Sequence, residues 1–225
     1  MSEEEKKLAG IEAAREVEKG GYIGLGTGST VRYAIEELGR RVREDGLEIK
    51  CIPSSADTRI LAIKNKIPLT TFEEIHELDI SIDGADQISS GYTLIKGGGA
   101  ALFREKVVAS NSKRFIVVVD KSKLSESLDI AVPVEVLPFA WAVVSERLKA
   151  LGCKKSKLRC ATGKSGPLLT DNGNYILDAS FGKIEYPQKL EEEINDIVGV
   201  VENGIFCGMA SKIIVGRDGR IEVLQ

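Results

Sequence analysis

Residues 22–31 read YIGLGTGSTV and contain the change of pattern that decides the fold. The first four residues form a short apolar run of the kind that makes a buried strand, and a glycine-rich turn at residues 26–30 follows directly. From residue 31 to residue 44 the apolar residues return at helical spacing. A strand that passes through glycines into a helix is typical of an α/β sheet, so this stretch predicts that class of fold.

The same alternation continues on both sides of this stretch. Apolar runs favour strands, and amphipathic runs that end at glycine or polar turns favour helices. We expect strands at residues 48–52, 78–82 and 115–119, a short extended piece at 92–95, and helices at residues 3–19, 56–65 and 100–110. Alternation of this kind predicts a doubly wound, mostly parallel, Rossmann-like sheet.

The pattern changes near residue 129. The segments after it favour a strand at 130–136, a helix at 138–151, a strand at 158–161, a hairpin at 168–180, a helix at 187–198 and a strand at 200–206. This β-α-β-β-α-β order is the ferredoxin-like arrangement. A final strand pair at 211–215 and 221–224 is expected to return to the first domain. The sequence thus predicts a Rossmann-like domain at residues 1–129 plus 207–225, with an inserted smaller α+β domain at 130–206.

Composition excludes several classes of function. The 225 residues carry a formal net charge of −3, and charged residues of both signs make up 29% of the chain. Nucleic-acid binding without sequence preference needs a basic surface, so it is not expected. No apolar run has the length of a signal-peptide core or a membrane span, so we expect a cytoplasmic protein with no membrane contact. The four cysteines form no C-x-x-C pair and there is one histidine, so no metal site is expected.

The glycine-rich turn resembles a dinucleotide fingerprint but fails as one. Ser29 stands where the third glycine is required, and the second strand, which ends at Ile52, carries no acid for a ribose hydroxyl. The sequence therefore predicts no nicotinamide cofactor, and no other cofactor motif is present.

Polar segments follow the predicted strands at their carboxyl ends, where ligands bind in open α/β sheets. The turn after the first strand offers backbone N–H groups, hydroxyls and a helix N-terminus to an anion, although a helix cap would use the same residue types. Two acids after the third strand suit sugar hydroxyls, a metal or a proton in transit, or an ordinary turn. Three successive glycines carry a high entropic cost that a close ligand would justify. The residues concerned are Thr27, Gly28, Ser29 and Thr30; Asp83, Gly84, Ala85 and Asp86; and Lys96, Gly97, Gly98 and Gly99.

Glu105 is the candidate base. It shares a helix face with Ala101 and Val108, at offsets of four and three residues. A carboxylate held among apolar neighbours is expected to have its pKa raised, which suits a general base near neutral pH. A solvated salt bridge within the helix would explain the same residue equally well.

Taken together and in order, these motifs resemble those of the ribose-5-phosphate isomerase A family. The resemblance extends over nearly the whole chain. Its motifs are GTGST at 26–30, SSADT at 54–58, DGAD at 83–86, KGGGAA at 96–101 followed by REK at 104–106, Asp120 with Ser122-Lys123, PVEVLPFA at 133–140, TDNGN at 170–174 and NGIF at 203–206. Two positions depart from the family's usual pattern, since Gln87 stands in place of an acid and Phe103 in place of a threonine.

The resemblance implies the interconversion of ribose 5-phosphate and ribulose 5-phosphate through an enediol or enediolate, in the pentose phosphate pathway, without a metal or cofactor. It implies that Glu105 transfers the proton, that Lys96, Asp83 and Asp86 assist the chemistry, and that Lys123 binds substrate with the three polar segments above. It also suggests a homodimer or homotetramer.

Other readings of the same fold remain open at this point. An amino-sugar-phosphate deaminase would need a histidine in the site, and His76 precedes a strand instead of following one. A coenzyme A transferase would use a glutamate nucleophile, for which Glu105 is a candidate. A sugar-phosphate sensor without catalysis is a further alternative, and it would be expected to carry a DNA-binding extension.

Overall fold

The structure is a computed structural model, and it describes residues 3–163 and 165–224. The chain divides into two compact units. The first comprises Met1–Ala85, Arg104–Lys123 and Met209–Gln225, and the second comprises Asp86–Phe103 and Leu124–Gly208. The sequence placed residues 86–103 with the first unit. They group with the second because the short strands β4 (Gln87–Ile88) and β5 (Leu94–Ile95) form a sheet with β11 (Ile205–Phe206).

The first unit is built on a six-stranded sheet. Its order is β13-β12-β6-β3-β1-β2, and every neighbouring pair is parallel except β12 and β13. The strands are β1 (Tyr22–Leu25), β2 (Lys50–Pro53), β3 (Ile80–Asp83), β6 (Phe115–Asp120), β12 (Lys212–Arg217) and β13 (Arg220–Leu224). This confirms the mostly parallel α/β sheet, including the return of the last two strands.

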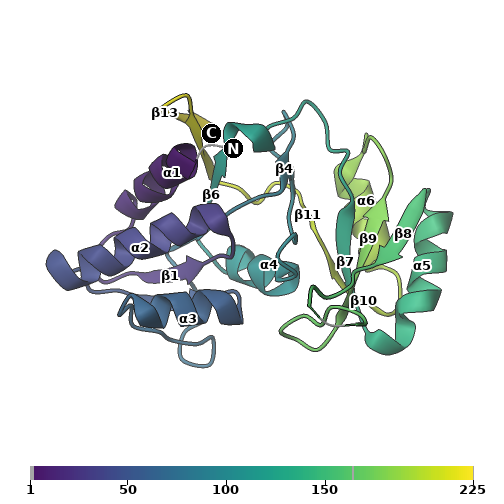
Figure 1. The fold of residues 1–225 in the computed structure, drawn as a ribbon, viewed down its shortest axis with the longest axis horizontal. Coiled ribbons are helices and arrows are strands. Elements are labelled where there is room, and N and C mark those ends of the chain that lie inside the picture. The colour runs from purple at the N-terminus through teal and green to yellow at the C-terminus, as the bar shows by residue number, and fades with distance from the viewer. Residues whose placement is uncertain (1–2, 164, 225) are drawn as a thin grey trace. The chain divides into compact units, whose positions relative to one another are not determined.

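Helices cover this sheet according to the alternation of its side chains. Ile23 and Leu25 of β1 point into the main core, which α1, α2 and α3 close. Gly24, between them, faces the other way and meets α4. The helices are α1 (Glu3–Arg15), α2 (Ser29–Glu44), α3 (Ala56–Lys64) and α4 (Leu102–Ser110), and a single 3-10 turn, η1 (Lys121–Lys123), follows β6. Figure 1 shows α1 and α2 side by side, an approach that Gly10 permits because a Cβ there would lie 2.8 Å from Thr30 O.

The second unit contains a four-stranded antiparallel sheet in the order β10-β7-β9-β8. Two helices, α5 and α6, connect its strands in the β-α-β-β-α-β order expected from the sequence (Figure 1). Buried valines of β7 pack against these helices to form a separate core. The elements are β7 (Val132–Val136), η2 (Pro138–Ala140), α5 (Trp141–Ala150), β8 (Lys155–Leu158), β9 (Tyr175–Ser180), α6 (Pro187–Asn195) and β10 (Val200–Asn203).

Three local expectations in this unit were wrong. The strand expected at 158–161 lies earlier, in β8, which pairs along its length with β9. The turn at 171–174 forms, with Thr170 N donating to Asn174 O at 2.9 Å, but residues 168–170 are not a strand. Residues 200–206 are two strands in two different sheets, because the chain passes from β10 to β11 at Gly204.

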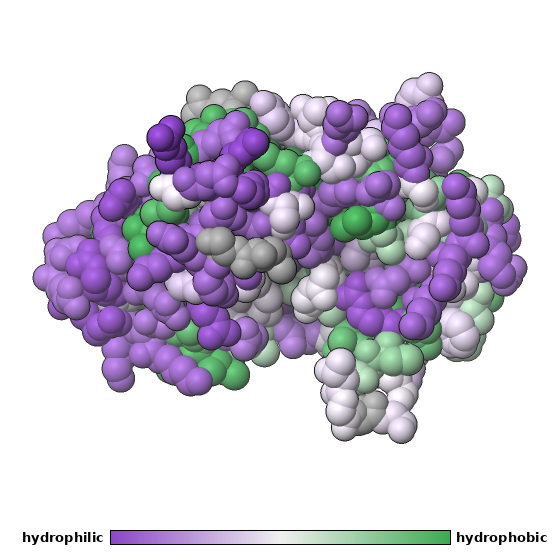
Figure 2. All heavy atoms as spheres, turned by 45° about the horizontal axis from the view of Figure 1, so that its top comes forward, coloured by the Kyte–Doolittle hydropathy of each residue, from purple (hydrophilic) through white to green (hydrophobic). Residues whose placement is uncertain are grey.

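The surface is mixed in character. On the face drawn in Figure 2, hydrophilic residues predominate, and hydrophobic residues occur mainly as separate spots. None of the helices in the described part of the chain is long and apolar enough to cross a membrane.

Candidate active site

The first group of predicted site residues lies where β1 and β3 end. The chain leaves β1 towards β2 on one side, and β3 lies on the other side of β1, so this is the point where the strand order reverses. Here the Thr27 N–H donates to Asp83 Oδ1 at 3.1 Å, and the Gly84 N–H donates to the same oxygen at 2.7 Å. The structure thus brings together two segments that lie 56 residues apart.

Gly26 permits this contact. A Cβ at Gly26 would lie 2.0 Å from Asp83 Cγ and 2.5 Å from its Cβ, so no other residue fits beside the buried carboxylate. Position 28 requires glycine because of its backbone conformation, since its φ of 136° lies in a region that residues with a side chain rarely adopt.

The hydroxyl of Thr27 has internal partners. Its Oγ1 lies 2.9 Å from Ser54 Oγ, 2.8 Å from Ser55 Oγ and 3.2 Å from Thr58 Oγ1. Thr58 Oγ1 in turn donates to Gly26 O at 2.8 Å. These residues follow β2, and their motif was noted in the sequence without a role. In the structure the motif holds the turn after β1 through the Thr27 hydroxyl, so that hydroxyl already has partners within the protein.

The N-terminus of α2 suits an anion. The helix begins at Ser29, has no side-chain cap at Gly28, and carries no acidic residue in its first turn. Gly28 and Ser29 are exposed to solvent, while Thr30 is buried beneath them. The first N–H groups and the positive end of the helix dipole therefore face an accessible position.

Glu105 lies on α4 and is buried, with 3% of its surface exposed. One turn further along, Val108 packs on β1, where a Cβ at Gly24 would lie 2.4 Å from Val108 Cγ1. The glycine lets α4 approach the sheet closely. The solvated salt bridge considered for Glu105 is not consistent with this burial.

The carboxyl end of β6 adds an acid and two lysines. Asp120 is buried, and Oδ1 accepts the Ser122 N–H at 2.9 Å. Lys121 pairs with Asp218 and lies 3.8 Å from Glu5, so its charge is already neutralised. Lys123 is half-buried and forms no ion pair within residues 3–163 and 165–224. Of these two cations, Lys123 is the one available to a ligand.

The second unit holds the remaining predicted residues. The Gly98 N–H donates to Asp86 Oδ2 at 2.7 Å, and a Cβ at Gly98 would lie 2.6 Å from Asp86 Oδ1. Lys96 is 2% exposed, and its Nζ lies 5.6 Å from the centre of the Phe206 ring, in cation–π geometry. Gly97 has a φ of 103°, so the turn needs glycine at that position.

The two departures from the family pattern have structural explanations. Gln87 Oε1 accepts the N–H groups of Asp129 and Ile130, and its Nε2 donates to Asp129 Oδ1 at 2.6 Å. An acid at position 87 would face that carboxylate with no donor. Phe103 packs in a small apolar cluster with Leu102 and Ile176.

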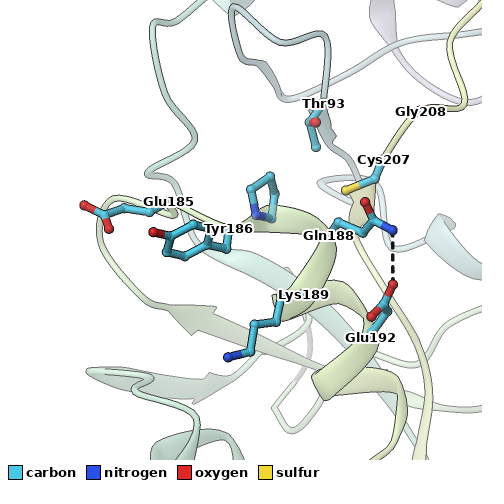
Figure 3. A pocket seen from close by; sticks show the side chains of 9 residues that line it. Thr93, Glu185, Tyr186, Gln188, Lys189, Glu192, Cys207 and Gly208 are labelled. Carbon is cyan, nitrogen blue, oxygen red and sulfur yellow. Dashed lines mark hydrogen bonds between the residues drawn. The ribbon is translucent and has the colours of Figure 1, made fainter.

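Other features of the structure do not add to this site. His76 is exposed in the loop that leads into β3. The described residues contain no group of three or more His, Cys, Asp or Glu side chains placed to hold a metal ion. A surface hollow of about 530 Å³ beside α6 is lined by Tyr186, Gln188 and their neighbours (Figure 3), and no predicted site residue is among them. Gln188 in this hollow is already hydrogen-bonded to Glu192 at 3.2 Å.

Comparison with known proteins points to one family. The family model described as ribose 5-phosphate isomerase A (phosphoriboisomerase A) matches residues 50–220. A ribose-5-phosphate isomerase A of Methanosarcina acetivorans is 52% identical over 220 residues, covering 98% of this chain and 94% of that protein. One from Methanothermobacter thermautotrophicus is 47% identical, covering 98% of this chain and 97% of its own length.

Solved structures agree with these relatives. The ribose 5-phosphate isomerase A of Methanocaldococcus jannaschii superposes with a TM-score of 0.94 at 43% identity, covering 98% of this chain and 97% of that one. A D-ribose-5-phosphate isomerase in complex with phospho-erythronic acid gives 0.95 at 41% identity, with the same coverage. These matches give no support to the deaminase, transferase or sensor alternatives.

Proposed function

Because the chain belongs to the ribose 5-phosphate isomerase A family, it interconverts ribose 5-phosphate and ribulose 5-phosphate, and we propose that Glu105 moves the proton in this reaction. The observation that carries the proposal is the junction of β1 and β3, where the Thr27 N–H binds Asp83 beside the open N-terminus of α2. A switch point of a parallel sheet is where such folds bind their ligands. The burial of Glu105 in the same unit supports its assignment as the base.

The reaction requires one base and a donor for a developing negative charge. In the open-chain aldose, the Glu105 carboxylate takes the proton from carbon 2, and the electron pair moves to give an enediolate with its charge on the carbonyl oxygen of carbon 1. A proton then passes from the oxygen on carbon 2 to that on carbon 1. Protonated Glu105 returns its proton to carbon 1, which yields the ketose and restores the carboxylate.

Other residues are assigned to binding and charge stabilisation. Lys96 and the N–H groups of Gly97–Gly99 that do not bind Asp86 stabilise the enediolate, because donors placed where charge develops lower the barrier. Asp83 or Asp86 opens the sugar ring by proton transfer. Thr27–Thr30 and Lys123 bind the substrate, with the phosphate attracted to the helix N-terminus and the lysine charge.

The test is direct. Purified protein mixed with ribose 5-phosphate should form the ketose, and phospho-erythronic acid, which binds one of the related isomerases, should compete with the substrate. Activity should survive exhaustive treatment with a chelator, because the proposed steps use only side chains and backbone donors. Loss of activity with EDTA that a divalent cation restores would mean that Asp83 and Asp86 hold a metal instead.

We further propose that the protein works as a homodimer or homotetramer in the cytoplasm. Residues 137–143 read LPFAWAV, with no charge, and Phe139 is fully exposed. Val198 is 93% exposed, and a hydrogen bond from Leu137 N to Gly199 O brings its loop beside this run. An uncharged apolar surface can meet its own copy without like-charge repulsion, and exposed apolar surface of this kind marks an interaction site. The four cysteines are free thiols, which suits a reducing compartment.

The mass of the protein in solution tests the assembly. Phe139→Glu should lower the mass measured by analytical ultracentrifugation, because it places a charge in the apolar surface. Ile60→Glu, at an exposed position on α3, is the matched control and should leave the mass unchanged. A wild-type protein that is monomeric at all concentrations would overturn the assembly proposal.

A further inference from the structure

Arg159 lies directly after β8 and makes contacts that its position in the sequence did not suggest. Its backbone is held by β9, where Arg159 N donates to Ile176 O at 2.8 Å. Its Nε and Nη2 donate to the two carboxylate oxygens of Asp178 at 3.0 and 2.5 Å, a bidentate pair that fixes the plane of the guanidinium. The side chain of Arg159 is 17% exposed, so solvent screens this pair only weakly.

The third nitrogen of the guanidinium contacts the loop of the three successive glycines, Gly97–Gly99, called the glycine loop below. Arg159 Nη1 donates to Gly97 O at 2.8 Å and to Gly98 O at 3.2 Å. The backbone is strained at the end of this loop, because Ala100 has a φ of 58°, which is uncommon for a residue with a side chain. Strained backbone persists only where its surroundings hold it in place, and the arginine supplies such a hold.

One peptide plane connects Arg159 to Asp86. In a trans peptide the C=O and the following N–H point in opposite directions. The carbonyl of Gly97 faces Arg159, so the N–H of Gly98 faces away from it, and that N–H donates to Asp86 Oδ2 at 2.7 Å. In the same way, the Gly98 carbonyl faces Arg159, and the Gly99 N–H is therefore turned to the side on which Asp86 lies.

We propose that Arg159 is a positioning residue for the isomerase reaction. Through the Gly97–Gly98 peptide it fixes the carboxylate of Asp86, and it turns the Gly99 N–H towards the substrate. The charge of Arg159 also polarises the Gly97–Gly98 peptide and strengthens the hydrogen bond from the Gly98 N–H to Asp86, because hydrogen bonds in a chain reinforce one another. The proposal rests on the assignment of Asp86 and the glycine loop to the substrate site.

The experiment is a double-mutant cycle on kcat and KM with ribose 5-phosphate as substrate. Arg159→Gln should lower kcat on the order of 10²-fold, the scale expected when a catalytic group moves by about 1 Å. In the Asp86→Asn variant, adding Arg159→Gln should lower kcat by less than roughly a further threefold, since the effects of residues that act through one contact are not additive. Arg159→Lys keeps the positive charge but lacks the planar guanidinium that binds both oxygens of Asp178, so its kcat should lie between those of the wild type and Arg159→Gln.

Arg41→Gln is the matched control. Arg41 also bridges two backbone carbonyls, Ala14 O at 2.5 Å and Val17 O at 3.1 Å, but at the end of α1. Both variants should lose similar thermal stability, and the control should keep its kcat. Additive losses in the cycle, or a kcat for Arg159→Gln equal to that of the control, would overturn the proposal. A wild-type protein that does not isomerise ribose 5-phosphate would overturn the proposed function itself, and this inference with it.

Discussion

The two units hold their candidate site residues in different ways. In the first unit, Thr27 and Asp83 meet through backbone N–H groups at the ends of neighbouring parallel strands, and Gly26 leaves room for them. In the second unit, the glycine loop depends on Arg159, which is 62 residues away in the chain from Gly97. Placement by strand order follows from the topology of the sheet, whereas placement by one long side chain depends on that one residue. Substitutions of residues that surround the site should therefore have little effect on the position of the first-unit residues, whereas a substitution of Arg159 should displace the glycine loop of the second unit.

The largest expected effect comes from Glu105→Gln. If the first unit carries the base, this change should lower kcat by about 10²–10⁴-fold, because glutamine keeps the shape of glutamate and cannot accept a proton. Substrate binding should persist, since the phosphate contacts are assigned to other residues. Exchange of the carbon-2 proton with deuterated solvent, measured by mass spectrometry, should occur in the wild type and stop in the variant.

A normal rate for Glu105→Gln would move the base elsewhere. Asp83 and Asp86 would be the next candidates for the base. Because these two acids belong to different units, it would then be undecided which unit carries the base.

Lys123→Ala tests whether the first unit also supplies the charge that attracts the phosphate. Loss of a charged hydrogen bond should weaken substrate binding by about 1.5–3 kcal/mol, seen as a higher KM. Lys121→Ala is the control, because Lys121 lies two residues away and is already paired with Asp218. Equal KM values for the two variants would remove Lys123 from the site.

Two glycine variants compare the units directly. Gly26→Ala places a methyl group against the buried Cβ and Cγ of Asp83, so unfolding should become easier by about 1–3 kcal/mol. Gly98→Ala meets only the end of the Asp86 side chain, which can rotate away, so its stability should change by less than about 1 kcal/mol while kcat falls. Urea unfolding and kinetics on the same preparations measure both quantities. The opposite order of stability losses would mean that Asp83 can move away from a side chain at position 26 and that Asp86 cannot move away from one at position 98.

The sequence was sufficient to predict the parallel sheet. Apolar strands, glycine turns and helical spacing are local signals. The rule that ligands bind at strand ends selects Thr27 and Asp83, two residues that contact one another in the structure. The same signals missed the sheet of β4, β5 and β11, because its strands are two residues long and β11 pairs with β5, which lies more than 100 positions earlier in the chain.

Arg159 could not be found from the sequence either. No recognisable motif surrounds it in the sequence, and its contacts depend on how β8 and β9 pair. The hairpin expected at 168–180 shows the same limit, since its turn chemistry was read correctly but the partner strands of β9 were not. Long-range pairing in an antiparallel sheet is set by packing that no short window contains.

The smallest expected effect concerns pH. A lowered pKa is found for several carboxyl groups of the first unit, namely Glu16, Glu37, Glu73, Asp79 and Asp218. For Glu16 the main cause is its hydrogen bond from Lys212, with a second from Arg114, which lower its pKa below 4.5. Asp79 has a lowered pKa chiefly because it accepts the Tyr22 N–H at 2.9 Å.

A carboxyl group whose pKa is lower in the folded state stabilises the fold above its unfolded pKa, and that contribution is lost as the pH falls through the folded value. For Glu16 the loss should therefore begin below about pH 4.5 and amount to no more than about 1 kcal/mol, because the ion pair is partly exposed and screened by solvent. Hydrogen exchange measured by mass spectrometry at pH 7 and pH 4 should show β1 and β12 of the first unit losing protection before β7 and β9 of the second. Glu16→Gln removes one of the titrating groups, so it should reduce the difference between the two units in the protection lost from pH 7 to pH 4. Equal loss of protection in both units would mean that these ion pairs contribute nothing measurable to the stability of the first unit.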